Sequence, residues 1–343
     1  MKAAVLYGKE QIQVEEVPPR PPQPGEVGVR IEAALTCGTD LKVYRRGYHA
    51  RMIVPPAVFG HEFSGVISEL GEGVTGWSVG ERVVAANSAP CGACYFCQHR
   101  QENLCDDLLF LNGAYAESIV VPARVVQKNL LRLKATTPFP DAALVEPLAC
   151  VVQGVEDSAL QAGQSVLVVG SGPIGLMLVA LAKHLGCRAT LAGRGQARLE
   201  TARRLGADEV VDVAGQADLV AAIRAHQVPG WDVVIEAVGK PEVWGACLRL
   251  VRKGGLVNFF GGCSSGTSLS LDTALMHYSS LTLRASFHHT PHAIRRALDL
   301  IEMGVVRAVD FVDGNCPLKH LPDLFRKMAA GNHAIKTLIH VHE

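Results

Sequence analysis

The chain has no excess of charge and no long apolar run. Its 33 basic residues balance 33 acidic residues in a length of 343. Nothing in this composition favours nucleic acid or an anionic membrane surface as a partner. No apolar segment reaches the ~18 residues that suggest a membrane-spanning helix. We therefore predict neither a nucleic-acid nor a membrane partner.

We expect neither a secretion signal nor a disulfide framework in this chain. Its N-terminus, MKAAVLYGKEQIQVEEV, alternates like a strand and soon meets acidic residues. Ten cysteines in 343 residues are too few for a disulfide scaffold. We predict a reducing, cytoplasmic compartment. Five cysteines stand apart from any cluster and are predicted to be buried small apolar residues: Cys150, Cys187, Cys247, Cys263 and Cys316.

Four cysteines do form a cluster, in CGACYFCQHRQENLC at residues 91–105. Cys91, Cys94, Cys97 and Cys105 have the spacing C-x2-C-x2-C-x7-C. Such spacing lets four thiolates close a tetrahedral shell, which predicts a structural zinc with no open position. An iron–sulfur cluster also uses C-x2-C steps, although Asp106 stands where its usual proline would be. A zinc ribbon for nucleic acid is a third reading, disfavoured by the few basic neighbours.

Three separated fragments predict a second, open metal site. LTCGTD supplies Cys37, VFGHEFSGVI supplies His61 and Glu62, and LVEPLAC supplies Glu146. One thiolate, one imidazole and one carboxylate would hold zinc with a position left for water or an alcohol. An open zinc lowers the pKa of a bound hydroxyl group. Either glutamate can be the third ligand, and the other can hold water.

Two further residues of the first fragment are predicted to serve this site. Thr39 lies two residues beyond Cys37, so its hydroxyl could pass on the proton that an alcohol loses. Asp40 could accept the second N–H of His61 and fix the histidine tautomer.

Residues 165–187 predict the start of a dinucleotide-binding unit. The apolar run 166–169 predicts a buried parallel strand, and a Gly-x-Gly-x-x-Gly turn and a helix follow it. Strands and helices continue to alternate to about residue 262, which predicts a doubly wound α/β unit. The predicted cofactor-binding residues of the turn are Gly170, Gly172, Pro173, Ile174 and Gly175.

The next predicted strand carries a signal for the choice of cofactor. An NAD site usually has an acidic residue at the end of this strand, to bind the ribose hydroxyls. Here the strand ends in Gly193 and Arg194, and Arg198 follows. A small residue leaves room for a 2′-phosphate, and either arginine could pair with it. The sequence therefore favours NADP(H), with NAD(H) as the alternative.

Taken together, these motifs resemble the zinc-dependent medium-chain dehydrogenases over essentially the whole chain. The resemblance implies an α/β fold with two domains. A GroES-like β-rich catalytic domain would comprise residues 1–150 and 290–343, and a doubly wound Rossmann domain residues 151–289. It also implies one catalytic and one structural zinc per chain, a homodimer or homotetramer, and further cofactor contacts at Glu236–Gly239, Gly261 and Gly262.

The segment around Glu146 resembles one branch of that family. Glu146 stands in VEPLAC where alcohol dehydrogenases with a Cys2His zinc would have a second cysteine. This form is similar to sorbitol dehydrogenase and to related cyclitol and sugar dehydrogenases. The expected reaction is hydride transfer between a secondary alcohol and NADP(H) or NAD(H). L-threonine 3-dehydrogenase and simple secondary alcohol dehydrogenase are the alternatives.

Two non-enzymatic readings and one substrate clue complete the predictions. A redox-regulated dinucleotide-sensing protein would lack a complete ligand set, which this chain has. A zinc-ribbon nucleic-acid binder would need a basic face. The basic stretch at residues 44–51, YRRGYHAR, either favours a phosphate or carboxylate on the substrate or is a solvated loop.

Overall fold

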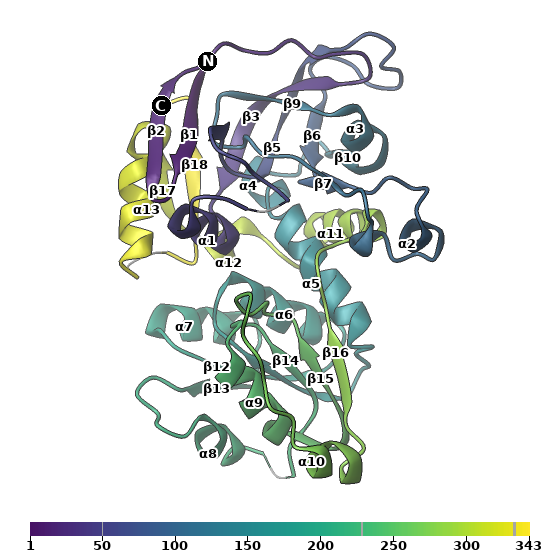
Figure 1. Cartoon of the computed structure of the whole chain (residues 1–343), viewed down its shortest axis with the longest axis vertical. Helices are drawn as coiled ribbons and strands as arrows, with labels where there is room; N and C mark the ends of the chain where they lie inside the picture. Colours follow the sequence, from purple (N-terminus) through teal and green to yellow (C-terminus); the bar gives the residue numbers. More distant parts are fainter. Residues whose placement is uncertain (50, 228, 332–333) are drawn as a thin grey trace. The chain divides into compact units, whose positions relative to one another are not determined.

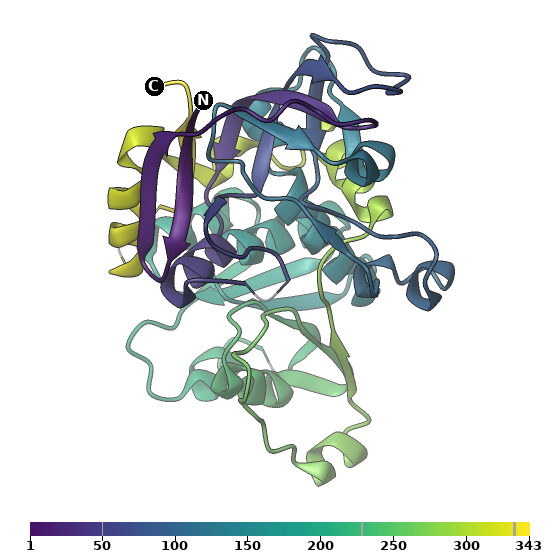
Figure 2. The ribbon, with the colours of Figure 1, turned by 45° about the horizontal axis from the view of Figure 1, so that its top comes forward.

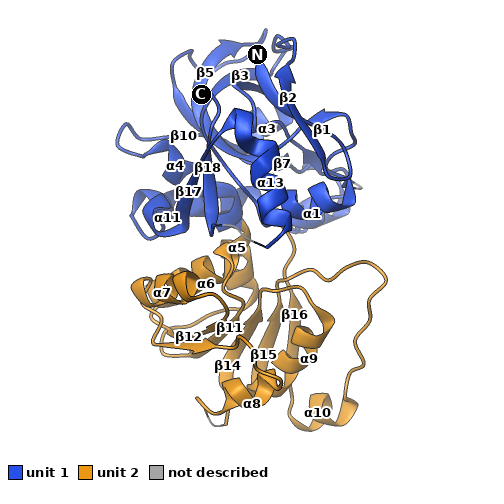
Figure 3. Cartoon of the chain, turned by 90° about the vertical axis from the view of Figure 1, so that its left-hand side faces the viewer, with its two compact units in different colours: residues 1–149, 289–343 blue, residues 150–288 orange. Residues whose placement is uncertain are grey.

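The structure is a computed structural model that describes residues 1–49, 51–227, 229–331 and 334–343. The chain forms two compact units (Figure 3). Unit 1 comprises residues 1–149 and 289–343, and unit 2 comprises residues 150–288. These limits differ by one residue from the predicted boundaries. Both ends of the chain therefore belong to unit 1.

Unit 1 is built mainly from antiparallel strands. Its largest sheet has the order β10-β6-β5-β3-β18-β17, with β9 also paired to β3; a second sheet has the order β2-β1-β4, and β7 pairs with β8. Figures 1 and 2 show the C-terminal helix α13 beside the β1–β2 hairpin. The strands are β1 Lys2–Gly8, β2 Gln11–Glu16, β3 Val27–Leu35, β4 Ala57–Val58, β5 Glu62–Leu70, β6 Arg82–Ala85, β7 Ser88–Ala89, β8 Leu109–Phe110, β9 Ser118–Val121, β10 Leu130–Arg132, β17 Val312–Pro317 and β18 Lys336–His340.

The helices of unit 1 are mostly short and connect these strands. Helix α1 begins after Cys37 and ends at Gly47, whose left-handed φ of 94° suits glycine. Helix α5 begins in unit 1 and continues into unit 2. The helices are α1 Gly38–Arg46, α2 Tyr95–Gln98, α3 Ala123–Asn129, α4 Phe139–Ala142, α5 Val145–Asp157, α11 Pro291–Glu302, α12 Ala308–Phe311 and α13 Leu321–Ala329, with 3₁₀ turns at Glu102–Leu104 and Leu318–His320.

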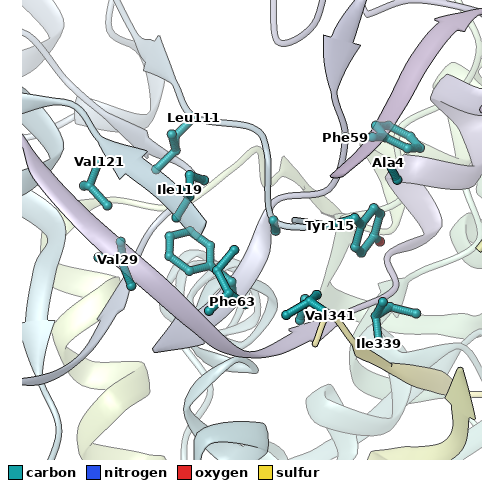
Figure 4. Packing of buried hydrophobic residues seen from close by; sticks show 14 of the residues in the cluster. Ala4, Val29, Phe59, Phe63, Leu111, Tyr115, Ile119, Val121, Ile339 and Val341 are labelled. Atoms are coloured by element: carbon teal, nitrogen blue, oxygen red, sulfur yellow. The ribbon is translucent and has the colours of Figure 1, made fainter. Parts of the chain in front are cut away.

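The core of unit 1 joins residues from both ends of the chain. Ala4 and Phe59 of the N-terminal half lie in the same buried cluster as Ile339 and Val341 of the C-terminal segment (Figure 4). The aromatic rings of Phe59 and Tyr115 meet edge to face, with centroids 5.8 Å apart. Burying this apolar surface is the main favourable term in folding, so unit 1 depends on its last residues as much as on its first.

Unit 2 is a six-stranded sheet with the order β13-β12-β11-β14-β15-β16, in which every neighbouring pair is parallel. This is the 3-2-1-4-5-6 order of a doubly wound dinucleotide-binding fold. The apolar run at 166–169 lies in the central strand β11, which is buried throughout. The prediction of a doubly wound α/β unit is confirmed. The strands are β11 Ser165–Val169, β12 Arg188–Gly193, β13 Glu209–Asp212, β14 Trp231–Glu236, β15 Val251–Phe259 and β16 Thr282–Ala285.

The helices of unit 2 cover its sheet. Helix α6 packs on β11 and β12, α7 packs on β12 and β13, and α9 packs on β14 and β15 with α8 against it (Figure 3). Their bounds are α6 Pro173–His184, α7 Gln196–Arg204, α8 Leu219–Arg224, α9 Pro241–Leu250 and α10 Thr273–Tyr278.

The prediction for the five isolated cysteines is only partly right. Cys187, Cys247 and Cys316 are buried, but Cys150 and Cys263 are partly exposed. Cys263 follows the glycine turn after β15, where the chain leaves the sheet.

Candidate metal and dinucleotide sites

Strand pairing in unit 1 assembles the first candidate metal site. Strands β3 and β5 are antiparallel with Leu35 opposite Glu62, so the end of one meets the beginning of the other. Cys37 follows β3 and His61 precedes β5. Ligand atoms of Cys37, His61 and Glu62 consequently lie within 4.8 Å of one another. Residues separated by more than twenty positions thus form one cluster.

His61 is held by a buried hydrogen-bond chain. Its Nδ1 donates to Asp40 Oδ1 at 2.9 Å, and Tyr115 Oη lies 2.6 Å from Asp40 Oδ2. Burial acts to lower the pKa of His61, but the charges of Asp40 and the Cys37 thiolate outweigh it and hold that pKa well above its usual value. With Nδ1 directed at Asp40, Nε2 is the nitrogen left to bind a cation.

Thr39 lies in the first turn of α1, partly exposed, and its backbone N–H donates to Cys37 Sγ at 3.4 Å. The thiol therefore caps the helix that carries both Thr39 and Asp40. Because one short turn holds all three residues, the spacing that suggested a common site also fixes their local geometry.

Glu62 is fully buried and pairs with a lysine that lies far from it in the chain. Lys336 Nζ lies 2.5 Å from Glu62 Oε2 and 2.9 Å from the carbonyl oxygen of Thr36. Glu62 Oε1 is buried without a hydrogen-bond partner among the described residues. A buried carboxylate oxygen without a partner is costly. A cation bound with Cys37 and His61 would satisfy it, so the donor set fits zinc.

Glu146 lies in a neighbouring group rather than with the three residues above. It begins the buried first turn of α5, and burial raises its pKa to about 7. His289 Nε2 lies 3.9 Å from Glu146 Oε1 and donates to Asn87 Oδ1 at 2.9 Å. The structure thus groups Glu62, and not Glu146, with Cys37 and His61.

The four clustered cysteines converge on one point in unit 1. Sγ–Sγ distances are 3.9 Å for Cys91–Cys97, 3.6 Å for Cys94–Cys97 and 3.8 Å for Cys94–Cys105. A tetrahedron with Zn–S bonds of ~2.3 Å has edges of about 3.8 Å. Backbone N–H groups of Ala93 and Cys94 lower the pKa of Cys91 to about 6. The geometry therefore fits a closed four-thiolate zinc site.

The glycine-rich turn of unit 2 connects β11 to α6. Pro173 and Ile174 begin the helix, and Gly172 precedes it as the cap residue. A Cβ atom at Gly175 would lie 1.8 Å from the carbonyl oxygen of Gly170, so the helix can approach the strand only with glycine there. The turn leads directly into the N-terminus of a twelve-residue helix, and such an N-terminus can bind a phosphate group through its backbone N–H groups.

A pocket of about 760 Å³ opens beside this turn and is lined only by residues of unit 2. Gly170, Gly172, Gly193, Arg194 and Arg198 all contribute to its wall. The pocket therefore brings together the turn and the end of β12, as the sequence predicted for a dinucleotide.

Pro173, Ile174 and Gly175 of the turn do not contribute to that wall, and neither do the predicted glycines 239, 261 and 262. Gly239 and Gly261 approach each other so closely that a Cβ at 261 would lie 2.4 Å from the Gly239 nitrogen. Glu236 organises this corner by accepting hydrogen bonds from the N–H groups of Val238 and Gly239, at 2.7 and 2.9 Å. Gly262 follows on the same turn. These residues form one compact corner after β14 and β15.

The basic stretch at 44–51 is partly used within unit 1. Arg45 donates to the carbonyl oxygen of Ala329, and Arg51 donates to that of Asp106 at 3.3 Å. His49 Nδ1 accepts the N–H of Met52 at 3.1 Å. Residue 50 lies outside the described residues. These contacts favour a structural role for the two arginines.

Sequence reasoning missed Lys336, Tyr115 and Asn87. Lys336 is the first residue of a strand whose other residues are largely buried, and a lysine at such a position is an unusual choice. That signal was available, but the sequence did not indicate which residue pairs with Lys336, because Glu62 lies 274 positions away.

In the described residues, no helix is both long and apolar enough to cross a membrane.

Comparison with known proteins identifies matching families in both units. Residues 23–132 match the alcohol dehydrogenase GroES-like domain, and residues 173–303 match the zinc-binding dehydrogenase family. A 2-dehydro-3-deoxy-L-galactonate 5-dehydrogenase of Pseudoalteromonas atlantica is 30% identical over 345 residues, covering 99% of this chain and 98% of its own. A sorbitol dehydrogenase of Bacillus subtilis is 27% identical and covers 99% of this chain and 97% of its own.

A solved structure is also similar over nearly the whole chain. It is a zinc-binding dehydrogenase from Sinorhizobium meliloti bound to NADP, 30% identical, with a TM-score of 0.89 and 98% of each chain covered. Both the GroES-like and the Rossmann parts of the predicted fold are confirmed by these matches. The two non-enzymatic readings find no support in them.

Proposed function

The chain belongs to the zinc-dependent medium-chain alcohol dehydrogenases, enzymes that use zinc and a nicotinamide dinucleotide, and from this premise we propose its substrate class, cofactor and site residues. The substrate is a secondary alcohol of a polyol, cyclitol or sugar derivative. The reaction is its oxidation to a ketone, with NADP⁺ as the preferred hydride acceptor, and its reversal.

The proposed catalytic metal ligands are Cys37, His61 and Glu62. The observation that carries the proposal is their buried cluster, in which Glu62 Oε1 has no other partner among the described residues. Asp40 presents His61 through Nδ1, and Lys336 holds the second oxygen of Glu62. When bound, zinc acts as a Lewis acid toward the alcohol oxygen, and the dinucleotide accepts the hydride.

Thr39 and Glu146 are proposed to move protons. The Thr39 hydroxyl, at the start of α1, relays the proton that the substrate hydroxyl loses: it accepts this proton and passes its own to water. Glu146 has a pKa near neutrality because it is buried, so it can hold a proton or a water molecule within the working pH range. Glu146 is also the alternative third ligand for the zinc.

The four cysteines are proposed to hold a second, structural zinc. Their Sγ separations match the edges of a zinc–sulfur tetrahedron, and no position is open for substrate. No disulfide joins any of the ten cysteines, all of which lie in the described part of the chain. Thiols in this state suit the reducing cytoplasm, which we propose as the compartment.

NADP(H) is the proposed cofactor because Arg194 and Arg198 line the pocket and β12 ends in Gly193 rather than in an acidic residue. A guanidinium group matches a phosphate in both charge and geometry. The NADP bound by the Sinorhizobium relative supports this choice. Gly239, Gly261 and Gly262 are proposed to contact the nicotinamide half.

A homodimer or homotetramer is proposed from the edge of the unit 2 sheet. Strand β16 pairs only with β15 among the described residues, and most of its residues are exposed. An unpaired strand edge is a template for pairing with another copy. Light scattering on purified protein would measure the assembly directly.

The experiment that tests the function combines metal analysis with a substrate panel. Protein carrying two zinc ions per chain is assayed at 340 nm with NADP⁺ and NAD⁺ against sorbitol, xylitol, inositols, sugar acids, L-threonine and simple secondary alcohols. Turnover of a polyol, cyclitol or sugar derivative supports the proposal. Preference for threonine or a simple alcohol would retain the mechanism and replace the substrate class. The Cys37→Ser variant, which lacks one proposed ligand of the catalytic zinc and keeps the four-cysteine site, is the control and should show no turnover.

A further inference from the structure

The end of β12 has a steric feature that neither the family matches nor the cofactor assignment explains. A Cβ atom built on Gly193 would lie 2.4 Å from Ser171 Cβ, 2.6 Å from Ser171 Oγ and 3.0 Å from the Ser171 nitrogen. Carbon atoms not bonded to each other rarely approach within 3.4 Å. The serine side chain therefore occupies the space that any side chain at 193 would need.

Ser171 also fixes the backbone that follows. Its Oγ donates to the carbonyl oxygen of Arg194 at 2.7 Å and accepts the Arg194 N–H at 3.0 Å. Ser171 itself is 6% exposed. The hydroxyl thus satisfies both backbone groups of Arg194 and holds this residue at the pocket wall, where its side chain is exposed.

The charges around this part of the pocket are of both signs. Arg194 and Arg198 stand beside the Ser171–Gly193 contact, whereas Asp218 and Glu242 belong to the segments that follow β13 and β14. Asp218 Oδ1 already accepts the Ala221 N–H as a helix cap. Arg194 and Arg198 therefore follow the same strand as Gly193, whereas Lys240 and Arg249 line the pocket in the segment after β14.

We propose that Ser171, the second residue of the glycine-rich turn, is a determinant of cofactor specificity. It excludes an acidic side chain from position 193 by occupying its space, and it presents Arg194 toward the 2′-phosphate. The inference rests on the proposed preference for NADP(H). Changing that preference therefore requires substitutions at 171 and 193 together, although only position 193 is the usual place of the acid.

The test is a double-mutant comparison on the zinc-loaded enzyme, with binding of NADP⁺ and NAD⁺ measured by calorimetry. Gly193→Asp alone should weaken the binding of NADP⁺ by about tenfold or more, because the carboxylate repels the 2′-phosphate. It should not tighten the binding of NAD⁺. The pair Ser171→Gly and Gly193→Asp should bind NAD⁺ about tenfold more tightly than Gly193→Asp does. Equal NAD⁺ binding by the single and double variants would overturn the inference.

A second measurement separates this inference from the cofactor assignment. Gly193→Ala should lower the melting temperature, and Ser171→Gly should restore most of that loss in the double variant, with Ser171→Gly alone as the reference. This result needs no cofactor. If the wild type prefers NAD⁺ while the two substitutions still compensate each other, the NADP assignment fails and the steric role stands. Additive effects on the melting temperature would overturn the steric role whichever cofactor is preferred.

Discussion

At the scale of single residues, the candidate metal site depends on groups that contact the ligands rather than on the ligands alone. Asp40 and Lys336 are both buried, and each contacts one ligand. Asp40 could be predicted because it lies three residues from Cys37 and carries a group that suits a histidine N–H. Lys336 could not, because nothing near it in the sequence indicates a carboxylate partner.

Replacing Asp40 by asparagine tests the orientation of His61. The amide can still meet Nδ1, but it removes the negative charge and allows the wrong tautomer. We expect zinc affinity or kcat to fall by about 10–100-fold. Competition with a chelator measures the affinity. Tyr115→Phe is the matched control because it removes only the hydroxyl on Asp40 Oδ2, and it should have the smaller effect. Equal zinc affinity in Asp40→Asn and wild type would contradict this role.

Replacing Lys336 by methionine tests the buried ion pair. It leaves Glu62 without its cation in a site with no exposure to water. Removing one partner of such a pair costs about 3–5 kcal/mol. Denaturant unfolding of the metal-free protein measures the loss, and Lys336→Arg keeps the charge as a control. A methionine variant as stable as the wild type would mean that Glu62 is protonated there.

At the scale of structural elements, the four-cysteine loop and the central strands are stabilised differently. The loop from α2 to β8 contains one short helix and one 3₁₀ turn, with almost no buried apolar side chains. The spacing of its cysteines was therefore the signal from which the sequence predicted this cluster, and the four thiols do converge. The strands of unit 2 could be predicted from apolar runs in the sequence, because both faces of a parallel sheet are buried.

Replacing Cys97 by serine tests the loop. We expect the zinc content to fall from two ions per chain to one, and the melting temperature to fall with it, because metal binding supplies folding free energy in such loops. Elemental analysis and calorimetry measure the two effects. Ser78→Ala is a control on an exposed loop of the same unit. A variant that keeps two ions would show that three cysteines suffice.

Asp232 at the start of β14 provides a test by pH. Its Oδ2 accepts the Ser165 N–H and O–H at 2.7 Å each, and its Oδ1 accepts Arg252 Nε at 2.7 Å. Burial acts to raise the pKa of Asp232, but these donors outweigh it and hold that pKa below the usual 3.8. A lowered pKa stabilises the folded state above the unfolded pKa, and this stabilisation is lost as the pH falls through the folded value.

The Asp232→Asn variant should therefore be less stable than wild type by about 1 kcal/mol at pH 7. The difference should shrink as the pH falls from about 5 to 3, because the wild-type carboxylate then takes up a proton. Urea unfolding across this range measures it. A difference that stays constant with pH would show that the charge of Asp232 contributes nothing.

At the scale of the whole molecule, the division into two units was readable from the position of the dinucleotide motif within the chain. A doubly wound unit beginning near residue 165 leaves both ends of the chain to form the other unit. The order of strands in unit 1 was not readable, since β18 inserts between β3 and β17 and pairs with a strand some 300 positions earlier. Short strands of this kind carry too little pattern to reveal such pairings.

Truncating the chain after Ala329 should unfold unit 1 and leave unit 2 folded. It removes β18 from the middle of the unit 1 sheet together with Lys336, so unit 1 should unfold. Unit 2 keeps all six strands and should survive limited proteolysis as a fragment near residues 150–288. A chain ending at Val341 retains β18 and serves as the control. Protection of residues 1–149 in the shorter chain would contradict this dependence.

The placement of Lys336 also has a consequence for the newly made protein. A ribosome adds roughly 5–20 residues per second, so the 274 positions between Glu62 and Lys336 correspond to a delay of about 14–55 seconds. During that interval unit 2 can emerge and fold, while the candidate metal ligands of unit 1 have neither their lysine nor strand β18. Zinc captured before β18 emerges would have to bind an incomplete sheet, which makes the emergence of β18 the step that completes the candidate metal site.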